Sequence, residues 1–286
     1  MEVWTIQKIL NWTEGFFKDR QIDTPRLDAE ILLAHVIKME RFYLYVNFDQ
    51  VLKPEQLAQY RELITKRVQR VPVAYLVGSK AFMSLNFKVN RDVLIPRPDT
   101  ETLVNYATEK LRKMSGELKV ADIGTGSGAI GISILRFVKN SIVSAVDISK
   151  KAIEIATTNA DLNKVTDRIK FYTGDLLKPL TGQKFKAVLS NPPYIPNKVV
   201  KTLQPEVAQY EPKLALEGGE DGLDFYRRLV KDAPDFIEEG GFLAVEIGIN
   251  QAAAVKNLIE SDGRLKDIES RKDLAGIERV IAAWKK

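Results

Sequence analysis

The chain of 286 residues contains no cysteine and only one histidine, His35. Without cysteine there can be no disulfide, thiolate nucleophile or thiolate-bound metal, and the composition fits a reducing cytoplasm. A single histidine also excludes sites built from several histidine ligands. Because His35 stands within the apolar stretch 33–37, we expect it to be packed or satisfied within a helix rather than catalytic. The chemistry of this protein must therefore use other groups.

Long hydrophobic runs and blocks of one charge sign are also missing. No run approaches the ~18 apolar residues of a membrane-spanning helix, and the mixed first residues do not resemble a secretory signal. We therefore expect a cytoplasmic protein with no membrane contact. The 43 basic and 38 acidic residues leave a thinly spread net charge of +5, so we expect no stable binding to nucleic acid.

Two patterns precede residue 98. Residues 1–75 carry apolar side chains at helical spacing, which predicts a small helical domain for substrate recognition. Val73, Tyr75 and Val77 alternate as in an extended segment, up to Gly78. Residues 76–97 are predicted to form a linker, because residues 82–89 and 93–95 have the pattern of a β-hairpin that turns at Asn90-Arg91-Asp92.

Residues 98–286 alternate apolar strands with amphipathic helices, a pattern typical of an α/β domain with a mostly parallel sheet. We expect this Rossmann-like region to be the catalytic domain, with seven strands and helices on both faces of the sheet. The predicted strands are 118–123, 141–146, 169–173, 185–190, 241–247, 265–269 and 278–283.

A glycine-rich turn, G-T-G-S-G, follows the first of these strands and opens a helix. Glycine allows the backbone to approach a ligand closely, and the helix N-terminus supplies free N–H groups. Asp147 ends the next strand, where its carboxylate can accept both hydroxyls of a ribose. These features predict an adenosine-type cofactor, with contacts from Gly124, Thr125, Gly126, Ser127, Gly128, Asp147 and Ile148.

The identity of this cofactor is left open by the turn itself, because Gly126–Gly131 also satisfies the dinucleotide pattern G-x-G-x-x-G. Three features favour S-adenosylmethionine over the nicotinamide cofactor of a dehydrogenase. Asp122, before the turn, is available to an ammonium group. Asp175 and Leu176, after the third strand, can meet an adenine. The third feature is the motif that ends the fourth strand, which has no obvious role in hydride transfer.

That motif is Asn191-Pro192-Pro193-Tyr194. Two consecutive prolines cannot continue a central strand, so they fix a rigid corner where ligands bind in open α/β sheets. A primary amide could donate one hydrogen to the Asn191 side-chain oxygen and one to the Pro192 carbonyl, while Tyr194 packs on its face. Pro193 would stiffen the corner. The alternative is a simple turn that ends a strand.

Together these segments resemble the release-factor glutamine methyltransferases (the HemK/PrmC family) over essentially the whole chain. The matching segments, besides the glycine turn, are R-V-P-V-A-Y-L-V-G at 70–78, I-P-R-P-D-T-E at 95–101, N-P-P-Y-I-P at 191–196, E-P-K-L-A-L-E-G-G-E-D-G-L at 211–223 and D-L-A-G-I-E-R at 273–279. The resemblance implies a class I methyltransferase fold. We expect the protein to be a monomer.

The resemblance also implies the reaction. A methyl group would pass from S-adenosylmethionine to the side-chain amide nitrogen (N5) of the glutamine in the Gly-Gly-Gln loop of peptide chain release factors, leaving S-adenosylhomocysteine. Asn191, Pro192 and Tyr194 would be catalytic, and Asn191 would also touch the cofactor. No metal and no strong base are required, in keeping with the composition.

For several further residues the sequence leaves two possible roles open. Arg97, Thr100 and Glu101 either line the methionine end of the cofactor or cap a helix. The pairs Glu211-Pro212 and Gly218-Gly219 either shape a peptide-entry loop or are structural. We expect structural roles for Glu246 and Arg279.

Two other functions share parts of this pattern. Nucleic-acid methyltransferases acting on adenine N6 or cytosine N4 use the same amino-group clamp on a flipped base, although the diffuse charge argues against them here. A non-catalytic protein that keeps the cofactor fold to contact the translation machinery is the second alternative.

Overall fold

The structure is a computed structural model that describes residues 3–286. The chain forms two compact units. The first contains the chain up to Gly78 together with Pro205–Tyr210, and the second contains Ser79–Gln204 and Glu211–Lys286. A short segment that is distant in sequence therefore belongs with the N-terminal helices. The predicted division of the chain into three domains at residues 75 and 97 stays a prediction.

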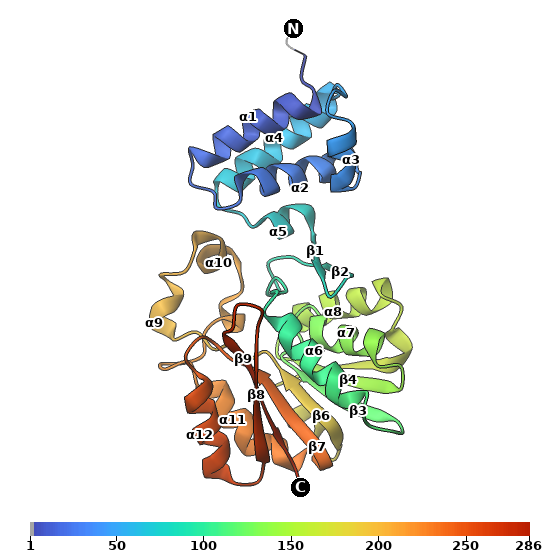
Figure 1. The fold of residues 1–286 in the computed structure, drawn as a ribbon, viewed down its shortest axis with the longest axis vertical. Coiled ribbons are helices and arrows are strands. Elements are labelled where there is room, and N and C mark those ends of the chain that lie inside the picture. The colour runs from blue at the N-terminus through green and yellow to red at the C-terminus, as the bar shows by residue number, and fades with distance from the viewer. Residues whose placement is uncertain (1–2) are drawn as a thin grey trace. The chain divides into compact units, whose positions relative to one another are not determined.

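The first unit is helical, as its apolar spacing predicts, and α1, α2 and α4 lie side by side (Figure 1). Pro25 and Pro54 occupy the first turns of α2 and α4, where a missing N–H costs nothing. Thr5 caps α1 by accepting from the Lys8 N–H. The helices are α1 (Ile6–Lys18), α2 (Pro25–Ile37), α3 (Arg41–Val46), α4 (Pro54–Val68), α5 (Val73–Val77) and α10 (Pro205–Tyr210).

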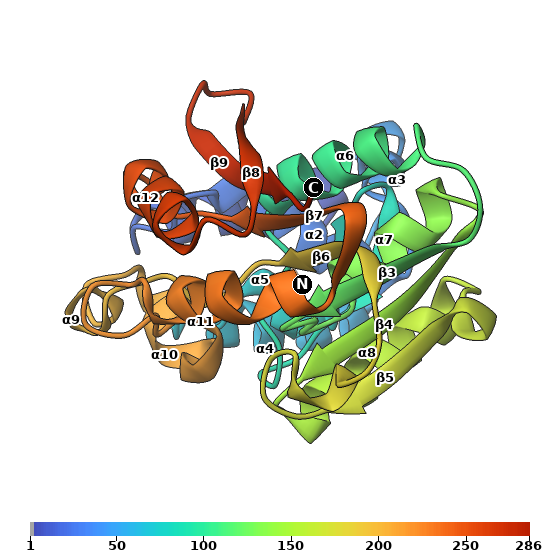
Figure 2. The same cartoon turned by 90° about the horizontal axis from the view of Figure 1, so that it is seen from below.

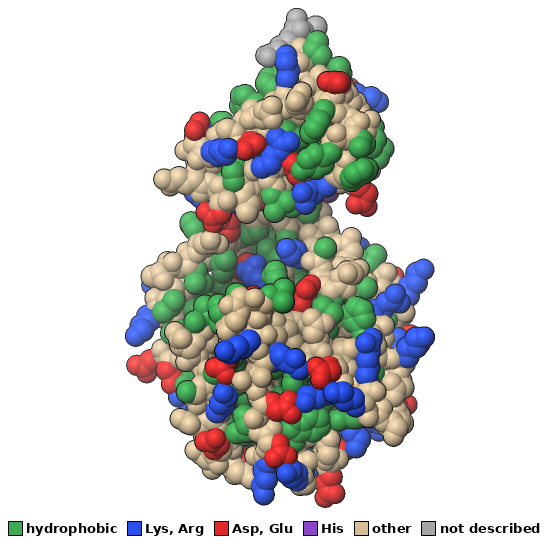
Figure 3. Space-filling model, in the orientation of Figure 1, with side chains coloured by type: hydrophobic (Ala, Val, Ile, Leu, Met, Phe, Trp, Pro, Cys, Tyr) green, Lys and Arg blue, Asp and Glu red, His purple; other side chains and the backbone are tan. Residues whose placement is uncertain are grey.

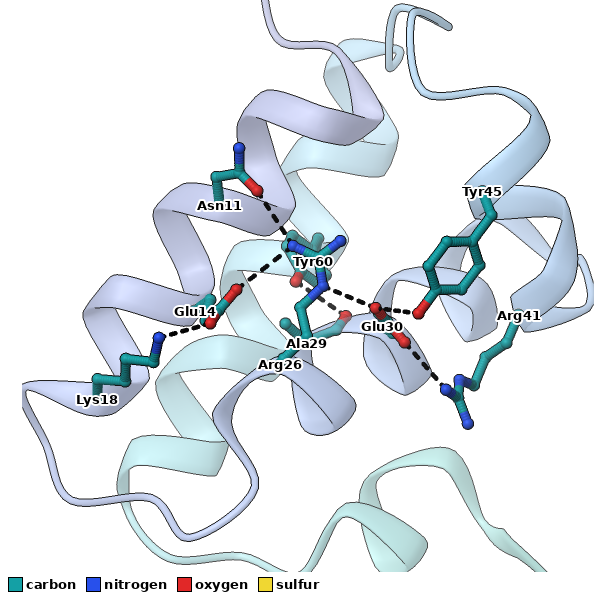
Figure 4. A network of polar contacts seen from close by, with 9 residues as sticks. All are labelled: Asn11, Glu14, Lys18, Arg26, Ala29, Glu30, Arg41, Tyr45 and Tyr60. Carbon is teal, nitrogen blue, oxygen red and sulfur yellow. Dashed lines mark hydrogen bonds and ion pairs between the residues drawn. The ribbon is translucent and has the colours of Figure 1, made fainter.

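A buried carboxylate, Glu30, ties α2 to α3 (Figure 4). It accepts hydrogen bonds from Arg26 at 2.7 Å, from Arg41 at 3.0 Å and from the Tyr45 hydroxyl at 2.6 Å. Arg26 also reaches α1 through Asn11. Every oxygen of the buried carboxylate is thereby satisfied, as a buried charge requires.

A second buried charge attaches α10 to this unit. Arg67 in α4 donates from Nε to Asp28 at 2.7 Å and from Nη1 to Glu206 at 2.8 Å. The Arg67 and Asp28 side chains are 6% and 7% exposed. Arg70 adds a second contact to Glu206. These ion pairs explain why Pro205–Tyr210 belongs to the first unit although it lies far along the sequence.

The second unit is built on a seven-stranded sheet with the order β5-β4-β3-β6-β7-β9-β8. Only β9 runs antiparallel to its neighbours, so the prediction of a mostly parallel sheet is confirmed. The strands are β3 (Leu118–Ile123), β4 (Ser141–Asp147), β5 (Ile169–Thr173), β6 (Phe185–Ser190), β7 (Ile237–Glu246), β8 (Lys266–Lys272) and β9 (Glu278–Trp284).

Alternation along the central strands divides the core into two layers. Val120 and Ala187 face one layer, whereas Ala121 and Val188 face the other. Figure 2 shows the first layer covered by α6, α7 and α8 and the second by α11 and α12. The helices of this unit are α6 (Thr100–Leu111), α7 (Ala129–Phe137), α8 (Lys150–Leu162), α9 (Asn197–Val200), α11 (Asp224–Asp232) and α12 (Ala252–Asp262).

The strand order reverses between β3 and β6. From β3 the chain moves outward through β4 and β5, and it then returns to place β6 on the other side of β3. At such a switch point the loops that follow the two strands diverge and leave a crevice at their carboxyl ends. The glycine turn follows β3 and the Asn191 motif follows β6, so both lie at this crevice.

Three local predictions are wrong. The alternating residues Val73–Val77 form the short helix α5 rather than an extended segment. The hairpin pairs β1 (Ser79–Phe82) with β2 (Leu85–Lys88), several residues before the predicted turn. His35 is exposed, because it lies on the outward side of α2.

The surface carries charges of both signs. On the face shown in Figure 3, Lys and Arg side chains are interspersed with Asp and Glu rather than gathered by sign. Within residues 3–286, the helices are too short or too polar to cross a membrane.

Replacing Arg67 with alanine tests the buried ion pairs of the first unit. Loss of Arg67 leaves the buried Asp28 carboxylate without its cation, although the Thr24 hydroxyl still donates to it, and this costs about 3 kcal/mol. Urea unfolding followed by tryptophan fluorescence, to which Trp4 and Trp12 of this unit contribute, should show this loss.

The matched control is Lys66→Ala, which removes an exposed pair with Glu62. Exposed pairs contribute little, so this variant should stay within about 0.5 kcal/mol of the wild type. Equal effects of the two substitutions would contradict the role given to Arg67.

Candidate functional site

A cleft of about 230 Å³ lies at the carboxyl ends of the central strands in the second unit. Its walls come from the turns after β3, β4, β5 and β6, together with the segment 92–94 and residues of α11. The predicted site residues that line it are Gly124, Gly126, Asp147, Ile148, Asp175, Leu176, Asn191, Pro192 and Pro193. The structure therefore brings residues from four separate turns to one cleft.

The glycine turn shapes one wall. Gly124, Gly126 and Gly128 have φ of 72°, 54° and 83°, which side chains disfavour. A side chain on Gly128 would also lie 2.7 Å from Ile132, so this glycine allows close packing against α7. At Gly124, by contrast, an added Cβ would meet nothing within 4 Å. The backbone of the turn is thus open toward the cleft.

The other three residues of the turn, Thr125, Ser127 and Gly128, do not line the cleft. Thr125 is buried and donates its hydroxyl to Asp122 at 2.6 Å. Ser127 is buried too, and its carbonyl accepts from Asn159. The Thr125 hydroxyl and the Ser127 backbone carbonyl therefore hold the turn in place.

Asp147 stands at the end of β4 with both oxygens at the cleft wall. Oδ2 accepts from the Gly126 N–H at 2.9 Å, and Oδ1 accepts from the Ser149 N–H at 2.9 Å. Burial raises the pKa of this carboxyl, although the hydrogen bonds from the backbone act to lower it. Each carboxylate oxygen has a further lone pair, so Asp147 can still accept hydrogen bonds from a diol.

Asp122 lies beneath the glycine turn and is completely buried. Its Oδ2 accepts from Thr125 and from the Gly131 N–H at 2.9 Å. Its Oδ1 has no partner among residues 3–286. Burial raises the pKa of Asp122 to about 6, an effect that the two hydrogen bonds oppose.

Asp175 follows β5 and is held by a residue that the sequence analysis missed. Arg228 of α11 contacts its two oxygens at 2.5 and 2.6 Å, and Lys178 contacts it at 2.8 Å. These cations, Arg228 foremost, lower the pKa of Asp175. Arg228 and Phe225 line the cleft near Asp175. Their only sequence signal is the amphipathic pattern of α11, which does not mark them as site residues.

Asn191 and Pro192 occupy the corner after β6. The Asn191 amide donates from Nδ2 to the Thr100 hydroxyl oxygen at 3.1 Å. The Pro192 carbonyl accepts no hydrogen bond from the described part of the chain. Two acceptors, the Asn191 side-chain oxygen and the Pro192 carbonyl, are thus available at one corner of the cleft.

Tyr194 differs from its neighbours in the motif because it does not line the cleft. Its ring packs into the core layer beneath α11 and α12, and its hydroxyl donates to Glu246 at 3.3 Å. The Tyr194 carbonyl accepts from Gln251 at 2.9 Å. Burial raises the pKa of the Tyr194 hydroxyl well above its usual range. Tyr194 is therefore anchored, and its proposed stacking on a substrate stays a prediction.

The loop after residue 210 packs directly on the corner. Ile195 exchanges hydrogen bonds with it, donating to the Leu216 carbonyl at 3.0 Å and accepting from the Gly218 N–H at 2.8 Å. A Cβ at Gly218 would lie 2.8 Å from the Pro193 carbonyl oxygen, so only glycine fits there. This loop supports the backbone of the motif.

Most other residues with open roles make structural contacts. Arg97 is paired with the buried Glu211, which also accepts from the Ile95 N–H at 3.2 Å. Glu101 accepts from the Met83 N–H in the hairpin turn at 2.8 Å. Arg279 forms ion pairs with Asp99 at 2.8 Å and with Asp273 at 2.9 Å.

Comparisons with known proteins agree with this fold. Residues 8–78 match the model of the PrmC N-terminal domain, and residues 100–210 match that of the methyltransferase small domain. The fold is similar to a crystal structure of a methyltransferase from Pyrococcus furiosus, with a TM-score of 0.52 over 77% of this chain and 98% of that chain. At 17% identity this likeness shows the fold alone. The fold and its cleft are those of a class I methyltransferase.

Sequence relatives narrow the class to a family. The chain is 42% identical over 280 residues to the release factor glutamine methyltransferase of Geobacter sulfurreducens, covering 98% of this chain and 96% of the relative. It is 43% identical over 258 residues to that of Clostridium acetobutylicum, covering 90% of each. This chain belongs to the release factor glutamine methyltransferase family.

Asp122→Asn tests the buried acid beneath the glycine turn. The folded state holds a proton on Asp122 up to a pKa of about 6, whereas the unfolded chain releases it near 3.8. Folding therefore binds protons between these values, and stability falls as the pH rises through this range. Above pH 6 the full penalty, about 3 kcal/mol, applies to the wild type and is absent in the variant.

The measurement is the free energy of unfolding of both proteins across this pH range. The variant should become more stable than the wild type, by an amount that grows as the pH rises. Glu246 also has a raised pKa, but its effect on stability is the same in both proteins and does not change the difference. Asp161→Asn, at an exposed position of α8, is the control. A difference that does not change with pH would contradict the burial of a charged Asp122.

Proposed function

We propose that this protein binds S-adenosylmethionine in the cleft and methylates the side-chain amide nitrogen of a glutamine. The proposal for the cofactor rests on the donor set of the cleft. Asp147 offers carboxylate lone pairs to the two ribose hydroxyls, and the open backbone at Gly124 and Gly126 offers room for close approach. Leu176 and Ile148 offer apolar surface for an adenine ring.

The methionine end of the cofactor fits Asp122. Its Oδ1 is buried and lacks a partner among residues 3–286, beneath the turn that would face the cofactor. A buried acceptor without a donor is costly, and an ammonium group nearby, directly or through water, would compensate it. The residues present therefore fit the cofactor at both its ends.

The corner at Asn191 and Pro192 carries the proposal for the substrate. An amide nitrogen is a weak nucleophile, because its lone pair is delocalised into the carbonyl. Two acceptors that each take one N–H hold the amide in a fixed plane and increase the electron density on nitrogen. Orientation of this kind can lower the free-energy barrier of a reaction between bound partners by about 7–11 kcal/mol.

S-adenosylmethionine, when bound, supplies a methyl group already activated by the sulfonium and leaves as S-adenosylhomocysteine. The glutamine nitrogen gains this methyl and loses one proton, which can pass to water. The residues of the corner bind and orient the amide, and the step requires no strong base. This division of labour explains why a chain without cysteine and with a single histidine is sufficient.

We infer that the protein substrate is a peptide chain release factor, on the strength of the named relatives. The glutamine would be that of the Gly-Gly-Gln loop. Recognition of the rest of the release factor is assigned to the first unit, whose residues 8–78 match the model of the PrmC N-terminal domain. The dispersed charge on the face shown in Figure 3 agrees with a protein substrate.

Two substitutions should separate chemistry from cofactor binding. Asn191→Ala removes one amide acceptor, so methyl transfer should fall about 100-fold or more while the Kd for S-adenosylmethionine stays within a few-fold. Asp147→Asn weakens the diol contact, so the Kd should rise about tenfold or more. Mass spectrometry of release factor and calorimetry with the cofactor measure the two effects.

Asn105→Ala and Asp161→Asn, both at exposed positions, are the matched controls. Wild-type protein should add one methyl to the loop glutamine of intact release factor, and more slowly to a Gly-Gly-Gln peptide that lacks contacts with the first unit. Methylation of DNA oligonucleotides but not of release factor would overturn the proposed function. A peptide as good as the intact protein would overturn recognition by the first unit.

A further inference from the structure

A groove in the first unit has no part in the proposed chemistry. It has a volume of about 420 Å³ and lies between α1 and α4, both of which pack on α2. Hydrogen bonds join the two sides at their ends, where Leu52 donates to the Trp4 carbonyl and Arg70 donates to the Arg20 carbonyl. Between these ends the groove follows α1, whose 13 residues span about 20 Å.

Aromatic rings form one wall of this groove. Trp12 and Phe16 stack with their centroids 4.9 Å apart, and Trp4 packs edge to face against Trp12 at 6.4 Å. The Arg20 guanidinium lies 3.5 Å from the centroid of the Phe16 ring. Trp12 is nevertheless 48% exposed, whereas tryptophan is on average well buried. This aromatic row therefore presents a fixed apolar surface to solvent.

The rest of the groove is mostly apolar too. Leu57 and Val68 of α4 line the wall opposite the aromatic row, and Ile9, Tyr60 and Ile64 are buried beneath it. An apolar surface of this kind on a folded domain commonly marks a site where another molecule binds.

The groove carries positive charge without a balancing acid. Arg20 and Arg61 line it, and no Asp or Glu of residues 3–286 does. Neither arginine is paired with a carboxylate in this part of the chain, whereas Arg26, Arg67 and Arg70 of the same unit are. The groove therefore complements a partner that is apolar along one face and acidic beside it.

The backbone of the walls limits the conformation of this partner. Both walls come from α-helices, whose N–H and C=O groups are bonded within the helix, so they offer no edge to which an extended segment could add. An amphipathic helix satisfies its own backbone, and about three to four of its turns fit along 20 Å. The groove therefore favours a helical partner.

The same aromatic row is poorly suited to nucleobases. Trp12 and Arg20 stand four positions before and four positions after Phe16, so they cover the two faces of its ring. A base stacks on an open ring face, which Phe16 does not offer. The row is thus better suited to apolar side chains of a protein.

We propose that this groove docks an amphipathic helix of the release factor, with its acidic side chains at Arg20 and Arg61. The inference rests on the proposed function, because it takes the partner to be the protein substrate, and it assigns recognition to one surface of the first unit. Trp and Arg are residue types that often dominate the binding energy of protein interfaces. Because the groove contains no residue of the methyl-transfer cleft, docking should act on KM rather than on kcat.

Kinetics with intact release factor test this docking site. Trp12→Ala removes an aromatic anchor and Arg61→Glu reverses a charge, so each should raise KM at least about tenfold. Their kcat, and their methylation of a Gly-Gly-Gln peptide, should stay within about twofold of the wild type. Phe42→Ala and Lys38→Glu are the matched controls, at exposed positions outside the groove, and should keep the wild-type KM.

A second measurement does not depend on turnover. The chain contains no cysteine, so Thr65→Cys places a single benzophenone label inside the groove. Illumination in the presence of release factor should cross-link the label to a helical segment with an apolar face and acidic residues. The same label at Lys38→Cys should leave that segment unmodified.

The outcomes separate the two proposals. If the wild type methylates neither release factor nor the peptide, the proposed function fails, and the cross-link still decides the docking site. An unchanged KM in Trp12→Ala and Arg61→Glu, or equal increases in Phe42→Ala and Lys38→Glu, would overturn the docking site. Cross-linking of Thr65→Cys to a second copy of this chain, or to a single-stranded oligonucleotide, in preference to release factor would overturn it as well.

Discussion

The structure depends on a constraint at the end of β6, where two consecutive prolines prevent the strand from continuing. The backbone must turn at Pro192, and its carbonyl is left without a partner in the sheet. Because β6 lies beside β3 at the reversal of strand order, this turn faces the glycine turn across one crevice. The position of the substrate corner relative to the cofactor cleft follows from that single arrangement of strands.

Supporting contacts keep this corner rigid. The loop at 211–219 hydrogen-bonds to Ile195 and packs Gly218 against Pro193, while Gln251 holds the Tyr194 carbonyl. Rigidity matters because an oriented amide gains reactivity only while both of its hydrogens are held. The corner is thus supported by segments from two other parts of the chain.

Buried acids are the energetic cost of the site. Asp122 and Glu246 are fully buried, each has one oxygen without a partner in the described residues, and each has a raised pKa. A protein selected for stability alone would place apolar side chains at such positions. Both acids lie directly beneath groups proposed to bind ligands, Asp122 under the glycine turn and Glu246 behind Asn191. Local destabilisation at functional positions is expected where the function needs a fixed acceptor.

Sequence reasoning predicted the features that depend on neighbours in the chain. The glycine turn, Asp147 at a strand end and the two prolines each have a local physical signal, and they mark most of the cleft. The contact of Arg228 with Asp175 and that of Thr100 with Asn191 join residues far apart in sequence, so no local pattern announces them.

The hairpin was misplaced for a different reason. Its turn places Met83 and Ser84 at φ of 49° and 56°, a conformation usually occupied by Asn and Gly. The residues therefore gave no turn signal, whereas Asn90-Arg91-Asp92 gave a false one. Helix α5 was missed because five residues between Pro72 and Gly78 are too few to show a helical period.

The central claim is that a planar amide is held by Asn191 and Pro192 with its nitrogen toward the cofactor cleft. A crystal structure with S-adenosylhomocysteine and a Gly-Gly-Gln segment of release factor tests it most directly. The account predicts the glutamine nitrogen at about 3 Å from both the Asn191 Oδ1 and the Pro192 carbonyl oxygen. A glutamine bound elsewhere, or an Asn191 whose NH2 group faces the substrate, would contradict it.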